Sequence, residues 1–271
     1  MNRLKNLKCT QLICRISAAI VRISFCFYIF FDVTFSNDIS VFFSDSFDQH
    51  KEGSTGAGAI PDIGDSWTRE EGGLFLYTIQ KQYSKSGNAL CIKKPAGEKA
   101  VLRGESDPVK GRLAGGVTIV LKVDLYYTKA GQGARLTLTP FGWPGFKPSV
   151  WLNPDGFFYI WVNEGGNEWK GRWQKTEIQQ IPGIWQTIEM TFKFGNEDKG
   201  RVPGVYDIIL QLPSNSKKNE KGQEISLARD VPVPLWPVKS WLHVQIENYE
   251  YQSRDTETVT YWDNVIMRSK Q

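Results

Sequence analysis

Cysteine is scarce in this chain, and its placement excludes a disulfide framework. Only four cysteines occur among 271 residues, and Cys9, Cys14 and Cys26 all lie near the start. The remaining one, Cys91, lies in an apolar run, where we expect a small buried residue. The chain also has just two histidines, so it has few of the soft ligands from which zinc centres are built.

Excess charge is also small once the first residues are set aside. The whole chain has 33 Lys and Arg against 29 Asp and Glu. Five of the basic residues and one acidic residue fall within residues 1–36, which leaves 28 of each sign. Binding to a nucleic acid requires clustered Lys and Arg that displace counterions from phosphates. We therefore expect no nucleic-acid partner.

Residues 1–36 have the pattern of an export signal. Basic residues up to Arg22 precede a nine-residue apolar run, 23–31, which is too short to cross a bilayer. Small residues follow, and we expect cleavage after Ser36. Because Arg22 and Asp32 bracket the run and no Ala-x-Ala is present, an uncleaved N-terminal anchor is the alternative. The pattern predicts a secreted, periplasmic or cell-surface protein that contacts a membrane only if this segment is retained.

Helical periodicity is missing from residues 37–271, and short strand signals fill this part instead. The predicted strands are 41–47, 74–81, 88–93, 99–105, 116–127, 134–140, 149–153, 157–163, 185–194, 205–212, 241–248 and 258–268. So many short strands predict a single all-β domain, a two-sheet antiparallel β-sandwich. Asn153–Gly156 is typical of a hairpin turn, whereas 213–222 and 231–237 are expected to be connections too short to separate domains.

Alternation within these strands separates a core face from an outer face. In 116–127, for example, Val117, Ile119 and Leu121 share one face and Thr118 and Lys122 the other. The same rule turns a mixed set of rings and hydrogen-bonding groups outward: Arg135, Thr137, Thr139, Tyr159, Trp161, His243, Gln245 and Glu247. Rings beside such groups complement a sugar, which has an apolar C–H face and a rim of hydroxyls. The alternative is that Tyr159 and Trp161 pack beneath a loop.

A tryptophan-rich stretch from Trp143 to Trp185 supports recognition of a ligand. Its segments 143–146 and 164–173 are Gly-rich and are expected to be loops. Large rings in loops are unfavourable unless they pack or bind. We expect Trp169 or Trp173 to be exposed at the mouth of a site.

Several motifs resemble one fold family. The opening segment Val41–Asp48, the turn Ser86–Ile92 and the closing segment Val259–Ile266 resemble the concanavalin A-like jelly rolls of laminarinase-type hydrolases, polysaccharide lyases and laminin-G-like modules. Gly183–Phe192 and Val205–Leu210 resemble their middle strands. The resemblance implies a jelly roll over residues 37–271 in which the first and last strands pair. The motifs are short and indicate architecture better than activity.

The same resemblance implies a structural calcium ion. Many domains of this kind hold Ca²⁺ where the opening and closing strands meet. The matching positions are Asp48, Asn88 (or the backbone of Gly87) and Asp263. Calcium takes several oxygen ligands, including carboxylates and carbonyls, in flexible geometry. The alternative is that Asp263 caps a turn and Asp48 is solvated.

No motif assigns an enzymatic reaction. The Glu-x-Asp-x-x-Glu strand of laminarinase-type hydrolases is missing, as are a nucleophile elbow, a phosphate loop, a dinucleotide fingerprint and a His-Glu-x-x-His helix. However, Val101–Ser106 resembles the "R-x-E" strand of jelly-roll polysaccharide lyases, and His243–Glu247 resembles their "Q-I-H" strand. The implied chemistry is abstraction of a proton beside a uronate carboxylate.

The lyase resemblance would give each polar residue a role. Arg103 or Arg135 would neutralise the uronate, Gln245 would assist, and His243 with Tyr159 or Tyr126 would move protons. Glu247, however, stands where those lyases place their histidine, and His243 lies four residues earlier.

Three functions therefore remain open. The leading one is a secreted carbohydrate-binding module that recognises a poly- or oligosaccharide on the concave sheet face through Arg103, Arg135, Tyr159, Trp161, His243, Gln245 and Glu247. The second is a polysaccharide-degrading enzyme, a uronate lyase rather than a glycoside hydrolase. The third is a structural or protein-interaction sandwich.

Overall fold

The structure is a computed structural model. It describes residues 40–106, 115–140, 148–163, 171–214, 222–237, 242–248 and 256–270, which belong to one compact unit, Ile39–Gln271. The predicted leader, the segment 143–146 and Trp169 lie outside the described residues. Among the residues that are described, no helix is long and apolar enough to cross a membrane.

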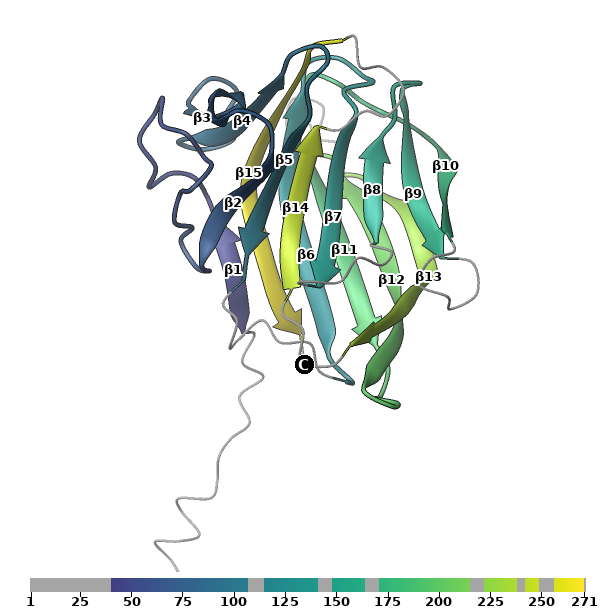
Figure 1. Cartoon of the computed structure of the whole chain (residues 1–271). Coiled ribbons are helices and arrows are strands. Elements are labelled where there is room, and N and C mark those ends of the chain that lie inside the picture. The colour runs from purple at the N-terminus through teal and green to yellow at the C-terminus, as the bar shows by residue number, and fades with distance from the viewer. Residues whose placement is uncertain are drawn as a thin grey trace, which may run out of the picture. The chain divides into compact units, whose positions relative to one another are not determined.

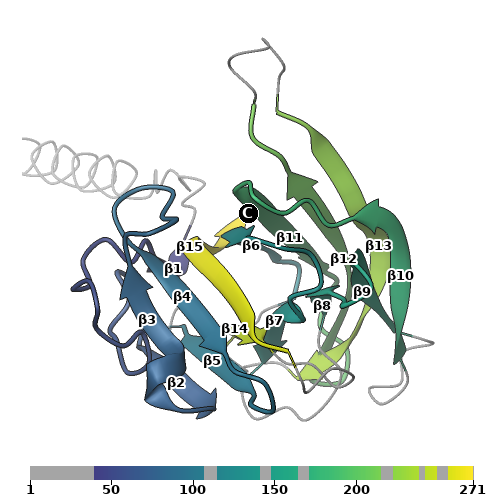
Figure 2. The same cartoon turned by 90° about the horizontal axis from the view of Figure 1, so that it is seen from above.

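Two antiparallel sheets stack face to face (Figures 1 and 2). The eight-stranded sheet has the order β13-β12-β11-β6-β15-β4-β3, and β1 pairs with β15. The seven-stranded sheet has the order β10-β9-β8-β7-β14-β5-β2. This is the predicted all-β two-sheet sandwich, a concanavalin A-like jelly roll.

The strands of the eight-stranded sheet are β1 (Val41–Asp45), β3 (Tyr77–Gln80), β4 (Ala89–Lys94), β6 (Thr118–Tyr127), β11 (Gln186–Phe194), β12 (Arg201–Gln211), β13 (Glu224–Pro237) and β15 (Thr258–Lys270). Those of the seven-stranded sheet are β2 (Ser66–Glu71), β5 (Ala100–Glu105), β7 (Ala134–Pro140), β8 (Ser149–Leu152), β9 (Phe157–Asn163), β10 (Gly171–Gln179) and β14 (Leu242–Asn248). One 3₁₀ turn, η1 (Leu74–Leu76), precedes β3.

The core between the sheets consists of the residues that alternation turns inward. Ile119, Leu121 and Val123 of β6 are buried in the same core cluster as Leu136 and Leu138 of β7. Such burial contributes about 25 cal/mol per Å² of apolar surface removed from water. The predicted inward set is therefore confirmed, and the residues between these positions face away from the core.

The opening and closing strands pair as the motifs predicted. Strand β1 lies antiparallel to β15, with Phe43 opposite Met267 and Asp45 opposite Val265. The buried Asp45 carboxylate accepts hydrogen bonds from the Trp67 indole at 2.6 Å and from His50 Nε2 at 2.9 Å. The Asp45 hydrogen bond raises the pKa of His50, although partial burial opposes the rise. This polar network fixes the turn that follows β1.

The predicted hairpin at Asn153–Gly156 is also confirmed. It joins β8 to β9, and the Gly156 N–H donates to the Asn153 carbonyl at 3.0 Å. Gly156 has a φ of 84°, a left-handed conformation that suits glycine. The turn aligns β8 and β9 so that Trp151 lies opposite Tyr159.

Three strands were not predicted, and one predicted strand begins late. β2 and β10 are edge strands with polar sequences, and five of the nine β10 residues are exposed, so neither shows an apolar alternation. β13 contains prolines and was expected to be a connection over 231–237, but an edge strand tolerates residues without an N–H. Residues 74–76 form the 3₁₀ turn rather than the start of a strand.

Candidate functional site

The predicted site residues lie in register on the outer face of the seven-stranded sheet, whose strands are labelled in Figure 1. One row runs from Glu247 on β14 to Arg135 on β7, Trp151 on β8, Tyr159 on β9 and Lys175 on β10. The next row contains Arg103, Gln245, Thr137 and Ser149, and on the outer strands Trp161 pairs with Trp173. A third row contains Glu105, His243 and Thr139. All seven predicted ligand-binding residues therefore lie on one face of one sheet.

Access to this face differs between its halves. His243, Gln245 and Glu247 on the central strand are buried, and His243 has no exposed surface. Arg103, Arg135, Tyr159 and Trp161 are partly exposed, as are Trp151 and Trp173. The aromatic residues on β8 to β10, together with Arg135 and Arg103, are thus the part of the face open to a ligand, whereas Thr137, Thr139 and Ser149 are buried.

Four aromatic rings form a continuous cluster in the open half. The Trp151 ring centroid lies 5.7 Å from that of Tyr159 and 5.1 Å from that of Trp173. The Trp161 and Trp173 rings meet edge to face at 5.3 Å. Gly171, beside Trp161, leaves room for its indole, because a Cβ there would lie 2.2 Å from Trp161 Nε1. We call these four residues, Trp151, Tyr159, Trp161 and Trp173, the aromatic cluster.

Two of its members were not among the predicted site residues. Trp173 was expected to be exposed on a loop, but it belongs to β10 and packs against Trp151 and Trp161. Trp151 shares the outward alternation of Tyr159 on the next strand, and this was the signal available in the sequence.

A buried ion pair adjoins the aromatic cluster. Arg135 Nη2 donates to the Glu247 carboxylate on the neighbouring strand, and Glu247 is only 2% exposed. The Arg135 guanidinium also lies 6.0 Å from the Trp173 ring centroid. The Arg135 cation and the Glu247 anion therefore lie beside the aromatic cluster, on its β7 and β14 side.

A second polar group lies at the outer border. The Asp155 carboxylate accepts hydrogen bonds from the Tyr159 hydroxyl at 2.9 Å and from Lys175 Nζ at 2.8 Å. Desolvation by itself would raise the pKa of Asp155. The hydrogen bonds from Lys175, the Phe157 N–H and Tyr159 outweigh this effect and lower the pKa. Desolvation and then the Asp155 carboxylate raise the pKa of Tyr159, so its hydroxyl stays protonated. Tyr159 therefore has a fixed orientation.

The residues named for lyase chemistry are only partly brought together. Arg103 lies opposite Gln245, and Glu105 lies opposite His243, on the adjacent strands β5 and β14. Tyr159 on β9 is three strands from β14, about 14 Å at ordinary strand spacing. Tyr126 was assigned wrongly, because β6 belongs to the other sheet and cannot contribute to this face.

The expected calcium ligands fit in part. The Asp48 carboxylate accepts the Asn88 N–H at 2.8 Å, and Asn88 Oδ1 is buried without a hydrogen-bond partner in the described structure. Asp263 already accepts N–H groups from Lys85 and Asn264. Burial, with the nearby carboxylates of Asp124 and Asp48, raises the pKa of Asp263 to about 7.

Side chains alone do not complete a metal centre here. Within the described ranges, no three His, Cys, Asp or Glu side chains converge as metal ligands. A cation at this position would therefore depend on Asp48, Asp263, the Asn88 Oδ1, backbone carbonyls and water. Calcium accepts such a set.

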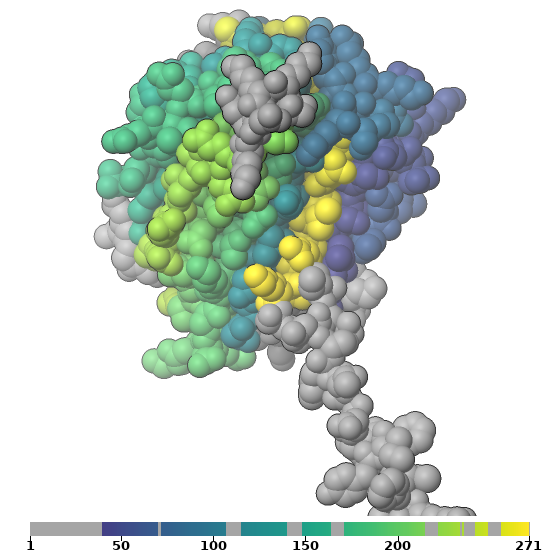
Figure 3. All heavy atoms as spheres, turned by 180° about the vertical axis from the view of Figure 1, so that it is seen from behind, coloured from purple at the N-terminus to yellow at the C-terminus, as the bar shows by residue number. Residues whose placement is uncertain are grey.

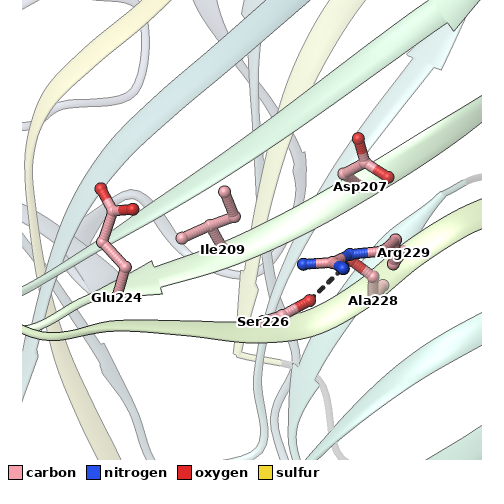
Figure 4. Close-up of a pocket in the computed structure, with 6 residues that line it drawn as sticks. All are labelled: Asp207, Ile209, Glu224, Ser226, Ala228 and Arg229. Carbon is pink, nitrogen blue, oxygen red and sulfur yellow. Dashed lines mark hydrogen bonds between the residues drawn. The ribbon is translucent and has the colours of Figure 1, made fainter.

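A cavity lies on the other sheet. It has a volume of about 270 Å³ and is lined by Asp207, Ile209, Glu224, Ser226, Ala228 and Arg229 of β12 and β13 (Figure 4). The Asp207 carboxylate already accepts the Asp230 N–H at 2.8 Å and Lys193 Nζ at 2.6 Å. The Asp207 carboxylate is therefore already hydrogen-bonded within the chain, and this cavity on the eight-stranded sheet is separate from the aromatic cluster.

Comparison with known proteins identifies the fold. No protein-family model matches the sequence, and no curated protein matches it. Among solved structures, the chain is similar to the PL-14 alginate lyase of the marine Aplysia kurodai, with 11% identity, 84% of this chain and 98% of that chain covered, and a TM-score of 0.55.

Two further solved structures are similar at lower scores. One is a carbohydrate esterase of the Shiga toxin-encoding bacteriophage phi24B, with 12% identity, coverages of 86% and 100%, and a TM-score of 0.44. The other is the alginate lyase Aly36B, with 9% identity, coverages of 85% and 98%, and a TM-score of 0.48. At such identities the likeness concerns the fold, and the chain thus has a jelly roll like that of the Aplysia enzyme.

Proposed function

We propose that the protein binds a poly- or oligosaccharide on the outer face of the seven-stranded sheet, and that it acts outside the cytoplasm. The observation that carries this proposal is the aromatic cluster, four partly exposed rings in which each centroid lies within 5.7 Å of at least one other, beside the Arg135–Glu247 ion pair. The similarity in fold to an alginate lyase supports a polysaccharide as the partner.

The cluster provides both kinds of contact that a sugar needs. Its rings can stack on the apolar C–H face of a pyranose. The Trp151 indole N–H is buried and has no acceptor among the described residues. Asn163, next along this face and only 4% exposed, likewise has a carboxamide without a partner in the described part of the chain. These groups therefore retain unused hydrogen-bonding capacity beside the rings.

Retention in a native gel tests the proposal directly. The protein should migrate more slowly in gels that contain alginate, laminarin or hydroxyethylcellulose than in a plain gel, relative to bovine serum albumin. Unchanged mobility with every polysaccharide would instead favour the third function, a structural sandwich whose rings only pack.

Lyase activity is a second candidate, favoured by the register of β5 and β14. Arg103 and Gln245 lie opposite each other, as neutralisation of a uronate carboxylate by a cation and an amide requires. His243 lies closer to this pair than Tyr159 does, but it is fully buried, which favours binding over lyase activity as the first candidate. The similar fold of the Aplysia alginate lyase supports this alternative.

If the second candidate holds, alginate or glucuronan should give products with the ultraviolet absorbance of an unsaturated uronate. Arg103→Ala should then lower the rate at least 100-fold, because the developing charge loses its neutralising group. The Phe75→Ala variant, which removes an exposed ring from the 3₁₀ turn η1, serves as the control and should keep most of the activity. Absence of the absorbance change from every uronate polymer contradicts lyase activity.

We also propose that Asp48, Asn88 and Asp263 hold a structural calcium ion. A cation bound to the folded state stabilises it by mass action. Calcium at 100 times its Kd should add about 2.7 kcal/mol, a rise in Tm of several degrees that EDTA reverses. Asn88→Ala should lose this rise. Equal melting temperatures in calcium and in EDTA, measured by circular dichroism, would count against the site.

A further inference from the structure

A second group of rings lies on the outer face of the other sheet, which Figure 3 views directly. Tyr126 on β6 lies opposite Tyr261 on β15. Tyr83, from the turn between β3 and β4, lies 5.0 Å from both rings and is nearly parallel to Tyr126, at 18°. Trp185 borders Tyr126 at 5.6 Å. We call Tyr83, Tyr126, Tyr261 and Trp185 the tyrosine platform.

Tyr83 is the outermost ring of the platform. Its exposed fraction is 40%, whereas Tyr261 is only 6% exposed and covers the buried Cys91. The backbone of Tyr83 has a φ of 60°, which is a strained value for a bulky residue. An unfavourable backbone that leaves a large ring in solvent is typical of a functional site.

The turn that bears Tyr83 is fixed to the sheet by its next residues. Lys85 donates from its N–H to Asp263 at 3.3 Å and from its ammonium to Asp124 at 2.9 Å. Asn264, itself at a φ of 47°, donates to the same Asp124 carboxylate at 2.9 Å. Tyr83 is therefore positioned before any ligand arrives, which reduces the entropic cost of binding.

The charges beside the platform indicate the chemistry of its ligand. Lys85 and Asp124 form an ion pair and neutralise each other, so this pair adds no net charge to the aromatic surface and phenolic hydroxyls of the platform. This suits a neutral pyranose ring, whereas a polyanion or a nucleic acid requires clustered cations. The platform and the aromatic cluster lie on opposite sheets.

We propose that the tyrosine platform is a second glycan-binding site, at which a neutral sugar ring stacks on Tyr83. The choice of a sugar as ligand rests on the proposed function of the protein. With one site on each outer face, a single molecule binds two polysaccharide chains and connects them. The tyrosine platform then acts through bridging and multivalency rather than through higher affinity for one chain.

Bridging can be measured with laminarin-coated beads and the full-length protein. Wild type should agglutinate the beads. Tyr83→Asn removes the ring and favours the left-handed backbone, and it should abolish agglutination while retention in a laminarin gel falls no more than about threefold. Tyr83→Phe keeps the ring and should agglutinate like wild type, as should Phe75→Ala, which removes an exposed ring elsewhere.

The outcomes separate the two proposals. Agglutination by Tyr83→Asn at wild-type levels overturns the second site, as does a wild type that is retained in the gel without agglutinating beads. A dimer that Tyr83→Asn converts to monomer, seen by light scattering, also overturns it, because the platform would then be a self-interface. Retention that Tyr83→Asn abolishes but Trp173→Ala leaves intact would instead contradict the aromatic cluster and leave the tyrosine platform as the site.

Discussion

Trp173→Ala is expected to abolish retention by the polysaccharide that slows the wild-type protein. The Trp173 ring contacts Trp151 and Trp161 and lies beside the Arg135 guanidinium, so its removal opens the middle of the aromatic cluster. A central aromatic side chain of a binding site contributes about 2 kcal/mol or more, roughly a 30-fold change in Kd. Affinity electrophoresis over a range of polysaccharide concentrations gives this Kd.

The edge position of β10 makes this variant informative. Because β10 pairs only with β9 and its residues are at least partly exposed, truncation of Trp173 should leave the sandwich folded. Phe75→Ala removes another exposed ring, far from this face in the fold, and should bind like wild type. A folded Trp173→Ala protein with an unchanged Kd would show that the cluster only packs.

Arg135→Met is expected to give the largest loss of stability among the variants. It leaves the Glu247 carboxylate, which is 2% exposed, without its cation. Breaking one partner of a buried ion pair costs about 3–5 kcal/mol. For a domain of this size the Tm should fall by on the order of 10 °C. Chemical denaturation followed by circular dichroism measures the change in free energy of unfolding.

Two further variants identify the cause of that loss. Arg135→Met combined with Glu247→Leu removes both charges and should recover most of the stability, since apolar replacement of a buried pair is often neutral. Lys175→Met breaks the more exposed pair with Asp155 and should cost no more than about 1 kcal/mol. A single Arg135→Met variant as stable as wild type would mean that Glu247 is solvated or has another cation.

The sequence predicts the buried part of this fold better than its edges. Strands such as β6 and β14 alternate between core and outer face, so their direction could be assigned from apolar spacing alone. β2, β10 and β13 lie at or near sheet edges, where one or both faces meet solvent and the apolar signal fades. Trp173 was accordingly expected to be in a loop.

The site was predictable as a face but not as an accessible surface. Alternation turned His243 and Trp161 outward, and the structure places both on the outer side of the same sheet. It could not indicate that His243 is fully buried there while Trp161 remains partly exposed. Burial of an outward residue depends on segments distant in the sequence, which no local pattern encodes.

The prolines of β13 have a consequence for behaviour at high concentration. This strand ends the eight-stranded sheet, and Pro232, Pro234 and Pro237 offer no N–H group to a neighbour. A free sheet edge otherwise recruits strands from other molecules and starts fibre growth. The prolines therefore interrupt the row of backbone N–H donors along this edge, which protects a β-rich protein from edge-to-edge aggregation.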